Sequence, residues 1–88
     1  MSPRQRAKID TVQPIVIAAL RARGWLCQSL AMCGHGVPDI LAHRPADGRW
    51  ALIEVKTDKG KLRPSQVRFQ LQGWPVSVVR SVADVEAL

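Results

Sequence analysis

The stretch WALIEVK, residues 50–56, decides the fold of this chain. Apolar and β-branched residues favour strands, and successive side chains of a strand point to opposite faces of the sheet. Glu54 and Lys56 therefore share one face, and the apolar odd-numbered residues share the other. Burying a carboxylate and an ammonium in such a strand is costly unless they pair or bind an ion. The stretch predicts a strand with a candidate site at its end, and a solvated Glu–Lys pair on an edge strand is the alternative.

Glycine, proline and capping residues around this strand predict the other elements. Gly24 ends a first helix, Pro64 suits the first position of a second, and Ser81 with Asp84 resembles a capping pair for a third. We expect helices over residues 12–23, 64–72 and 82–88 and strands over residues 25–32, 37–43, 50–57 and 74–80. This order, α-β-β-β-α-β-α, predicts an α/β fold in which helices flank a mixed sheet of about four strands.

The composition indicates a small basic protein. The chain has 88 residues, so we expect a single domain, residues 1–88, in which residues 1–8 form a flexible basic arm. The formal net charge of +6 favours a polyanionic partner, with nucleic acid first and an acidic membrane surface second. The longest apolar run, residues 15–20, is too short to span a bilayer, and no signal sequence is evident. We therefore expect a cytoplasmic protein without a membrane partner.

A second acidic residue joins the candidate site. The motif Gly36-Val37-Pro38-Asp39 leads into the apolar strand that precedes residues 50–57. Antiparallel pairing of these strands would bring Asp39 within reach of Glu54 and Lys56, and a capping or turn aspartate is the alternative. Two carboxylates with backbone carbonyls suit Mg²⁺ or Mn²⁺. Such an ion binds a phosphodiester oxygen and activates water, which Lys56 can hold or deprotonate.

Together these motifs resemble the PD-(D/E)XK nucleases, and more narrowly the VRR-NUC branch of compact virus-type nuclease domains. That branch has a Gly-x-Pro-Asp strand, a Glu-x-Lys strand, a helix that carries a glutamine, and a glycine turn into a last strand. The matching segments here are residues 36–39, 54–56, 62–66 and 73–76. The resemblance covers residues 11–88 and implies a restriction-endonuclease-like core.

The resemblance also implies a mechanism. Asp39, Glu54 and the carbonyl of Val55 would bind Mg²⁺ or Mn²⁺, Lys56 would serve the water, and Gln66 would be a supporting catalytic residue. Virus-type members resemble structure-selective endonucleases that act as homodimers on branched DNA such as Holliday junctions. No small organic cofactor is implied. A compact domain of this type suits a phage or mobile element, and hence a bacterial or phage-infected cytoplasm.

One feature departs from the family pattern. The family usually carries a glutamate on the first helix that points at the metal, and this sequence has none there. Gln13 and Asp10 are the nearby candidates for that ligand. A neutral ligand at this position would leave less negative charge around the metal.

Other polar and aromatic residues have weaker patterns. The residues that we expect to contact nucleic acid are His35, Lys59, Lys61, Arg63 and Arg68, and for His35 a solvated loop histidine is the alternative. Cys27, Cys33, His35 and His43 fit no zinc-binding spacing. Trp25, Trp50 and Trp74 each begin a predicted strand, where we expect packing at the rim of the sheet, and stacking on an unpaired base is the alternative.

Three functions follow from these observations. The first is a metal-dependent endonuclease that hydrolyses DNA. The second is a nucleic-acid-binding module with the nuclease fold and little or no turnover, which the missing helix glutamate favours. The third is an interaction domain whose positive charge serves an acidic protein, and a steep fall of DNA affinity with salt would argue against it.

Overall fold

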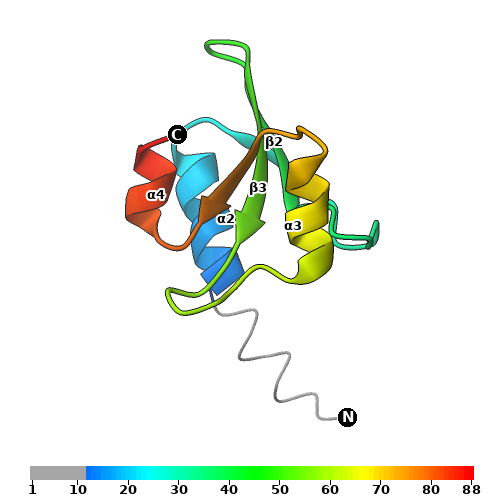
Figure 1. The fold of residues 1–88 in the computed structure, drawn as a ribbon. Coiled ribbons are helices and arrows are strands. Elements are labelled where there is room, and N and C mark those ends of the chain that lie inside the picture. The colour runs from blue at the N-terminus through cyan, green and yellow to red at the C-terminus, as the bar shows by residue number, and fades with distance from the viewer. Residues whose placement is uncertain (1–11) are drawn as a thin grey trace.

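A mixed four-stranded sheet forms the centre of this computed structural model, which describes residues 12–88 (Figure 1). In chain order the elements are α2 (Val12–Ala22), β1 (Leu26–Ser29), β2 (Ile40–Arg44), β3 (Arg49–Val55), α3 (Pro64–Leu71), β4 (Val76–Val79) and α4 (Val82–Glu86). This order confirms the predicted α/β fold class. The expected basic arm and the candidate ligand Asp10 lie outside the described residues. No helix within residues 12–88 has the length and apolar character needed to cross a bilayer.

The strands lie in the order β1-β2-β3-β4. Pairing is antiparallel from β1 to β3 and parallel between β3 and β4, and α3 lies in the long connection that a parallel pair requires. Ile40 pairs with Ile53 and Leu41 pairs with Leu52, so the two faces predicted for residues 50–56 are confirmed. Ile53 is fully buried on one face, whereas Trp50 on the other face is 65% exposed.

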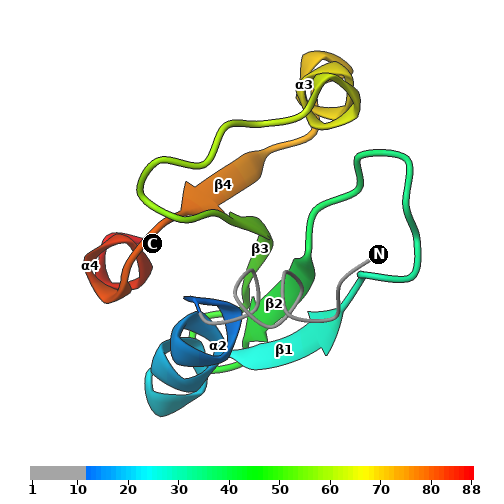
Figure 2. The same ribbon diagram turned by 90° about the horizontal axis from the view of Figure 1, so that it is seen from below.

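The core lies between the sheet and two helices. α2 and α4 cover one face of the sheet, and α3 lies on the opposite side (Figure 2). Val16 and Leu20 are four residues apart, so they share one face of α2 and are buried against Ile40 and Ile53. Val85 of α4 completes this cluster. Each fully buried aliphatic side chain stabilises the fold by about 1.5–3 kcal/mol, so this face holds the elements together.

None of the residues of α3 is fully buried, so the helix is not held by a buried apolar face. The contacts of its first turn position it instead. Pro64 occupies the start of the helix, as predicted, where its missing N–H needs no partner. Gly36 has a φ of 80° and packs directly on this turn. A Cβ at Gly36 would collide with the carbonyl of Ser65 and lie 2.9 Å from the backbone nitrogen of Gln66. Only glycine fits here, so the Gly-x-Pro-Asp turn docks the helix that carries Gln66.

All four strands are shorter than the sequence predicts, and the contacts at β1 and β2 show why. The first strand is expected over residues 25–32, but β1 ends at Ser29 because the chain turns away there. The N–H of Leu30 donates to the carbonyl of Asp39 over 2.7 Å and closes this end of the strand pair. The second strand is expected from residue 37, but β2 begins at Ile40. Pro38, which has no N–H to donate to a neighbouring strand, precedes it.

The rim position expected for Trp25 is wrong. Its side chain is only 2% exposed and belongs to the core, and the guanidinium carbon of Arg44 lies 4.7 Å from its ring centroid. Trp50 and Trp74, by contrast, are 65% and 51% exposed. The difference follows from the helix that precedes Trp25: its backbone N–H donates to the carbonyl of Leu20, which folds the residue back under α2.

Candidate active site

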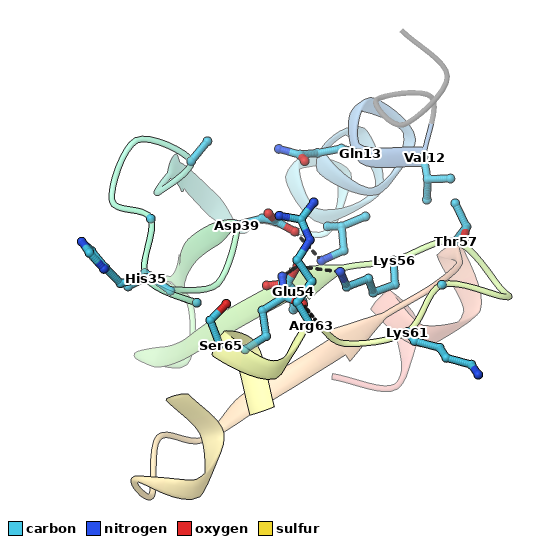
Figure 3. A pocket seen from close by; sticks show the side chains of 17 residues that line it. Val12, Gln13, His35, Asp39, Glu54, Lys56, Thr57, Lys61, Arg63 and Ser65 are labelled. Carbon is cyan, nitrogen blue, oxygen red and sulfur yellow. Dashed lines mark hydrogen bonds and ion pairs between the residues drawn. The ribbon is translucent and has the colours of Figure 1, made fainter. Parts of the chain in front are cut away.

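A pocket of about 600 Å³ opens at the C-terminal end of β3 (Figure 3). Its walls come from the start of α2, the loop before β2, the end of β3 and the segment that leads into α3. The lining residues are Val12, Gln13, Ala31, Gly34, His35, Gly36, Val37, Asp39, Glu54, Val55, Lys56, Thr57, Gly60, Lys61, Arg63, Ser65 and Gln66. The two motifs of the sequence, residues 36–39 and 54–56, therefore meet in one place.

Asp39 and Glu54 form the acidic centre of this pocket. Asp39 directly precedes β2, and its Oδ2 accepts a hydrogen bond of 2.8 Å from the backbone N–H of Val55. The side chain is thereby fixed against β3. Glu54 is only 3% exposed. Its burial, followed by the neighbouring Asp39 carboxylate, raises the pKa of Glu54 to about 7. Two carboxyl groups are thus held together where one resists ionisation.

Lys56 and Gln66 both approach the same oxygen of Glu54. The ammonium of Lys56 lies 3.8 Å from Glu54 Oε2, and the Lys56 side chain is 15% exposed. Gln66 Nε2 donates to Glu54 Oε2 over 3.0 Å, while Gln66 Oε1 accepts from the backbone N–H of Arg63 over 2.7 Å. Gln66 therefore ties the start of α3 to the buried carboxyl. The positive charges of Lys56 and Arg63 lower the pKa of Glu54 but do not offset its burial.

The donor set of the pocket fits Mg²⁺. Asp39, Glu54 and the carbonyl of Val55 offer the hard oxygen donors that this ion binds. Burial and the neighbouring Asp39 carboxylate raise the pKa of Glu54, and a divalent cation beside the two carboxyl groups would lower it again. Across residues 12–88, no group of three or more His, Cys, Asp or Glu side chains is arranged to hold a metal. Gln13 of α2 also lines the pocket, and the carboxylates in the lining are those of Asp39 and Glu54.

The structure brings some of the predicted nucleic-acid contacts to the pocket. His35, Lys61 and Arg63 line it. Lys59 and Arg68 are exposed but do not line it. The backbone of His35 has a φ of 58°, an unusual left-handed conformation between two glycines that share it.

Several lining residues are not among the predicted site residues, and three of them are neighbours of predicted ones. Thr57 and Gly60 follow Lys56, and Ser65 precedes Gln66. The only indication of these residues in the sequence is that they lie close to the candidates Lys56 and Gln66.

Comparison with known proteins agrees with this geometry. The profile of the VRR-NUC domain family matches residues 5–83. A solved structure of a VRR-NUC domain superposes with a TM-score of 0.71 and 33% sequence identity, and the alignment covers 92% of each chain. No curated protein matches the chain. The match spans most of the sequence and includes every motif of the pocket, so the chain belongs to the VRR-NUC family of nuclease-type domains.

Proposed function

We propose that this protein is a metal-dependent endonuclease that hydrolyses phosphodiester bonds of DNA, with Mg²⁺ or Mn²⁺ as its metal. The observation that carries the proposal is the buried carboxyl of Glu54, which lies beside Asp39 and 3.8 Å from the ammonium of Lys56. Lys61 and Arg63 line the same pocket, so positive charge is available for the phosphates of a nucleic acid. Perturbed carboxyl groups in an open, basic pocket are typical of catalytic sites.

Each residue has a role in this proposal. Asp39, Glu54 and the Val55 carbonyl would hold the cation, which supplies Lewis acidity and neutralises charge at the phosphodiester. The Lys56 ammonium can donate a hydrogen bond to the attacking water or to the phosphate as negative charge develops. Gln66 fixes the orientation of Glu54 through its 3.0 Å hydrogen bond. Lys61 and Arg63 would hold flanking phosphates.

We further propose that the substrate is branched DNA and that a homodimer binds it. The sheet face opposite α2 carries an apolar row in which Leu26 pairs with His43 and His43 pairs with Trp50. Leu26 is 62% exposed and Trp50 is 65% exposed, and Trp74 borders the same hollow as Trp50. Exposed apolar groups of this kind mark protein interfaces. A two-fold dimer would present two pockets to a two-fold junction.

A nucleic-acid-binding module with weak catalysis is the second candidate. The observation that favours it is the neutral Gln13 on the α2 side of the pocket, which leaves two carboxylates to attract the metal. Such a protein would bind DNA through the same basic side chains and cut it slowly.

The test is cleavage of a labelled four-way DNA junction and of a matched linear duplex, with Mg²⁺, with Mn²⁺ and with EDTA. The proposal predicts metal-dependent cutting that Lys56→Ala abolishes and Arg23→Gln retains, since Arg23 does not line the pocket. Faster cutting of the junction than of the duplex would support branch selectivity. Salt-sensitive binding of DNA without cutting of either substrate would favour the second candidate.

A further inference from the structure

Arg80 forms hydrogen bonds with the turn over residues 57–60, which follows β3. It comes directly after β4, and its Nη1 donates hydrogen bonds of 2.7 Å to the carbonyl of Thr57 and 2.7 Å to the carbonyl of Gly60. The same Thr57 carbonyl accepts from the N–H of Gly60 over 3.1 Å, which closes the turn. One guanidinium nitrogen thus joins both ends of the turn over residues 57–60.

The backbone of Arg80 is itself held in place. Its N–H donates to Asp84 Oδ2 over 2.8 Å, and Asp84 lies in the first turn of α4 behind the capping residue Ser81. Among residues 12–88, no carboxylate forms an ion pair with Arg80. Its charge is directed to the two carbonyls, and hydrogen bonds from a charged donor are stronger than neutral ones. Arg80 therefore connects the start of α4 to the turn.

The turn over residues 57–60 also packs on Lys56. A Cβ at Gly60 would lie 3.5 Å from the Cβ of Lys56 and 3.0 Å from Thr57 Oγ1, so the backbone of Gly60 lies against the stem of Lys56. On the backbone side, the N–H of Lys56 donates to the carbonyl of Val79 over 3.0 Å. The backbone of Lys56 is thus held by β4, the base of its side chain lies beside Gly60, and its ammonium points toward Glu54 (Figure 3).

We propose that Arg80 is a positioning residue that holds the Lys56 ammonium beside Glu54 through the carbonyl of Gly60. Arg80 does not line the pocket and so acts through the turn. Loss of the two hydrogen bonds would free the turn, and Lys56 would sample positions away from Glu54. The consequence for catalysis rests on the proposed nuclease function, whereas the consequence for the position of Lys56 does not.

The first test compares Arg80→Gln, Arg80→Lys and the control Arg23→Gln. Arg23 also donates to a backbone carbonyl, that of Ala19, but it lies beyond the end of α2 away from the pocket. With DNA at saturation and Mg²⁺ present, we expect the single-turnover rate of Arg80→Gln to fall about 10- to 100-fold, because small displacements of a catalytic group have effects of this size. Arg80→Lys should recover part of the rate because its ammonium can still donate to a carbonyl, and Arg23→Gln should keep the wild-type rate.

The dissociation constant for DNA in EDTA separates positioning from direct contact. We expect it to change by less than about threefold in Arg80→Gln, since a charge that touches no phosphate contributes little in salt. A loss confined to DNA affinity, with the rate at saturation unchanged, would make Arg80 a phosphate contact and overturn the proposal. Arg80→Lys, which keeps the charge, provides a second variant if Arg80→Gln does not fold.

The second test needs no cleavage. In NMR spectra of the free protein, Arg80→Gln should speed amide hydrogen exchange at Gly60 and shift the ε-methylene resonances of Lys56, and Arg23→Gln should do neither. If the wild type cuts no DNA but these changes occur, the positioning role stands and the nuclease proposal fails. If the resonances of Lys56 do not move, the positioning role is refuted whether or not the protein cuts DNA.

Discussion

Glu54→Gln removes the charge of the buried carboxyl and keeps the shape of the side chain. Glu54 is 3% exposed, and burial with the Asp39 carboxylate raises its pKa from 4.5 to about 7. In the unfolded chain the carboxyl titrates near its ordinary value. Between these two pH values the folded state binds more protons than the unfolded state, so this group makes the fold less stable as pH rises through that window.

The magnitude follows from the two pKa values. A tenfold change in proton affinity corresponds to about 1.4 kcal/mol, so ionising Glu54 in the fold costs about 3 kcal/mol above pH 7. Without metal, we expect Glu54→Gln to exceed the wild type in unfolding free energy by about 3 kcal/mol at pH 8 and by about 1 kcal/mol or less at pH 5. In a domain of this size the difference at pH 8 corresponds to about 10–20 °C in Tm.

Urea unfolding in EDTA at both pH values, followed by tryptophan fluorescence, to which the buried Trp25 contributes, measures this difference. Glu86→Gln is the control, because it makes the same chemical change at a side chain that is 59% exposed. Added Mg²⁺ at pH 8 should stabilise the wild type but not Glu54→Gln, since a ligand of the folded state stabilises it. Equal stability of wild type and Glu54→Gln at pH 8, or a difference independent of pH, would refute the reasoning.

Three other substitutions test separate parts of the structure. Gly36→Ala should destabilise the protein by about 1–3 kcal/mol in urea unfolding, because alanine is strained at a φ of 80° and its Cβ meets the first turn of α3. Gln13→Glu adds a third carboxylate to the pocket, and a more negative ligand set binds a cation more tightly. The Mg²⁺ concentration for half-maximal binding, measured by calorimetry, should fall about tenfold. Unchanged binding would show that Gln13 does not reach the metal. Trp50→Glu places a charge on the exposed apolar row and should shift a dimer toward monomer in sedimentation, whereas an unchanged mass would exclude that row as the interface.

Much of the fold was predictable because its signals are local. The alternation in residues 50–56 reports which side chains share a face, and Pro64 and Ser81 mark helix starts through backbone chemistry that depends on near neighbours. The approach of Asp39 to Glu54 was also predictable, since consecutive antiparallel strands bring their facing ends together. The strand limits near Ser29 were not, because hydrogen bonds with a distant loop set them.

The sequence by itself therefore determined the order of the elements, the two faces of β3 and the family. Only the tertiary structure decided that Trp25 is buried, that Gln66 binds Glu54 and that Arg80 reaches the turn after Lys56. Arg80 and Thr57 are 23 residues apart in the chain, and Gln66 and Glu54 are 12 apart. Such contacts depend on how α3 crosses from β3 to β4 and on which side chains then meet. Periodicity and capping patterns reflect interactions between residues that are close in the sequence, so they do not predict contacts between distant residues.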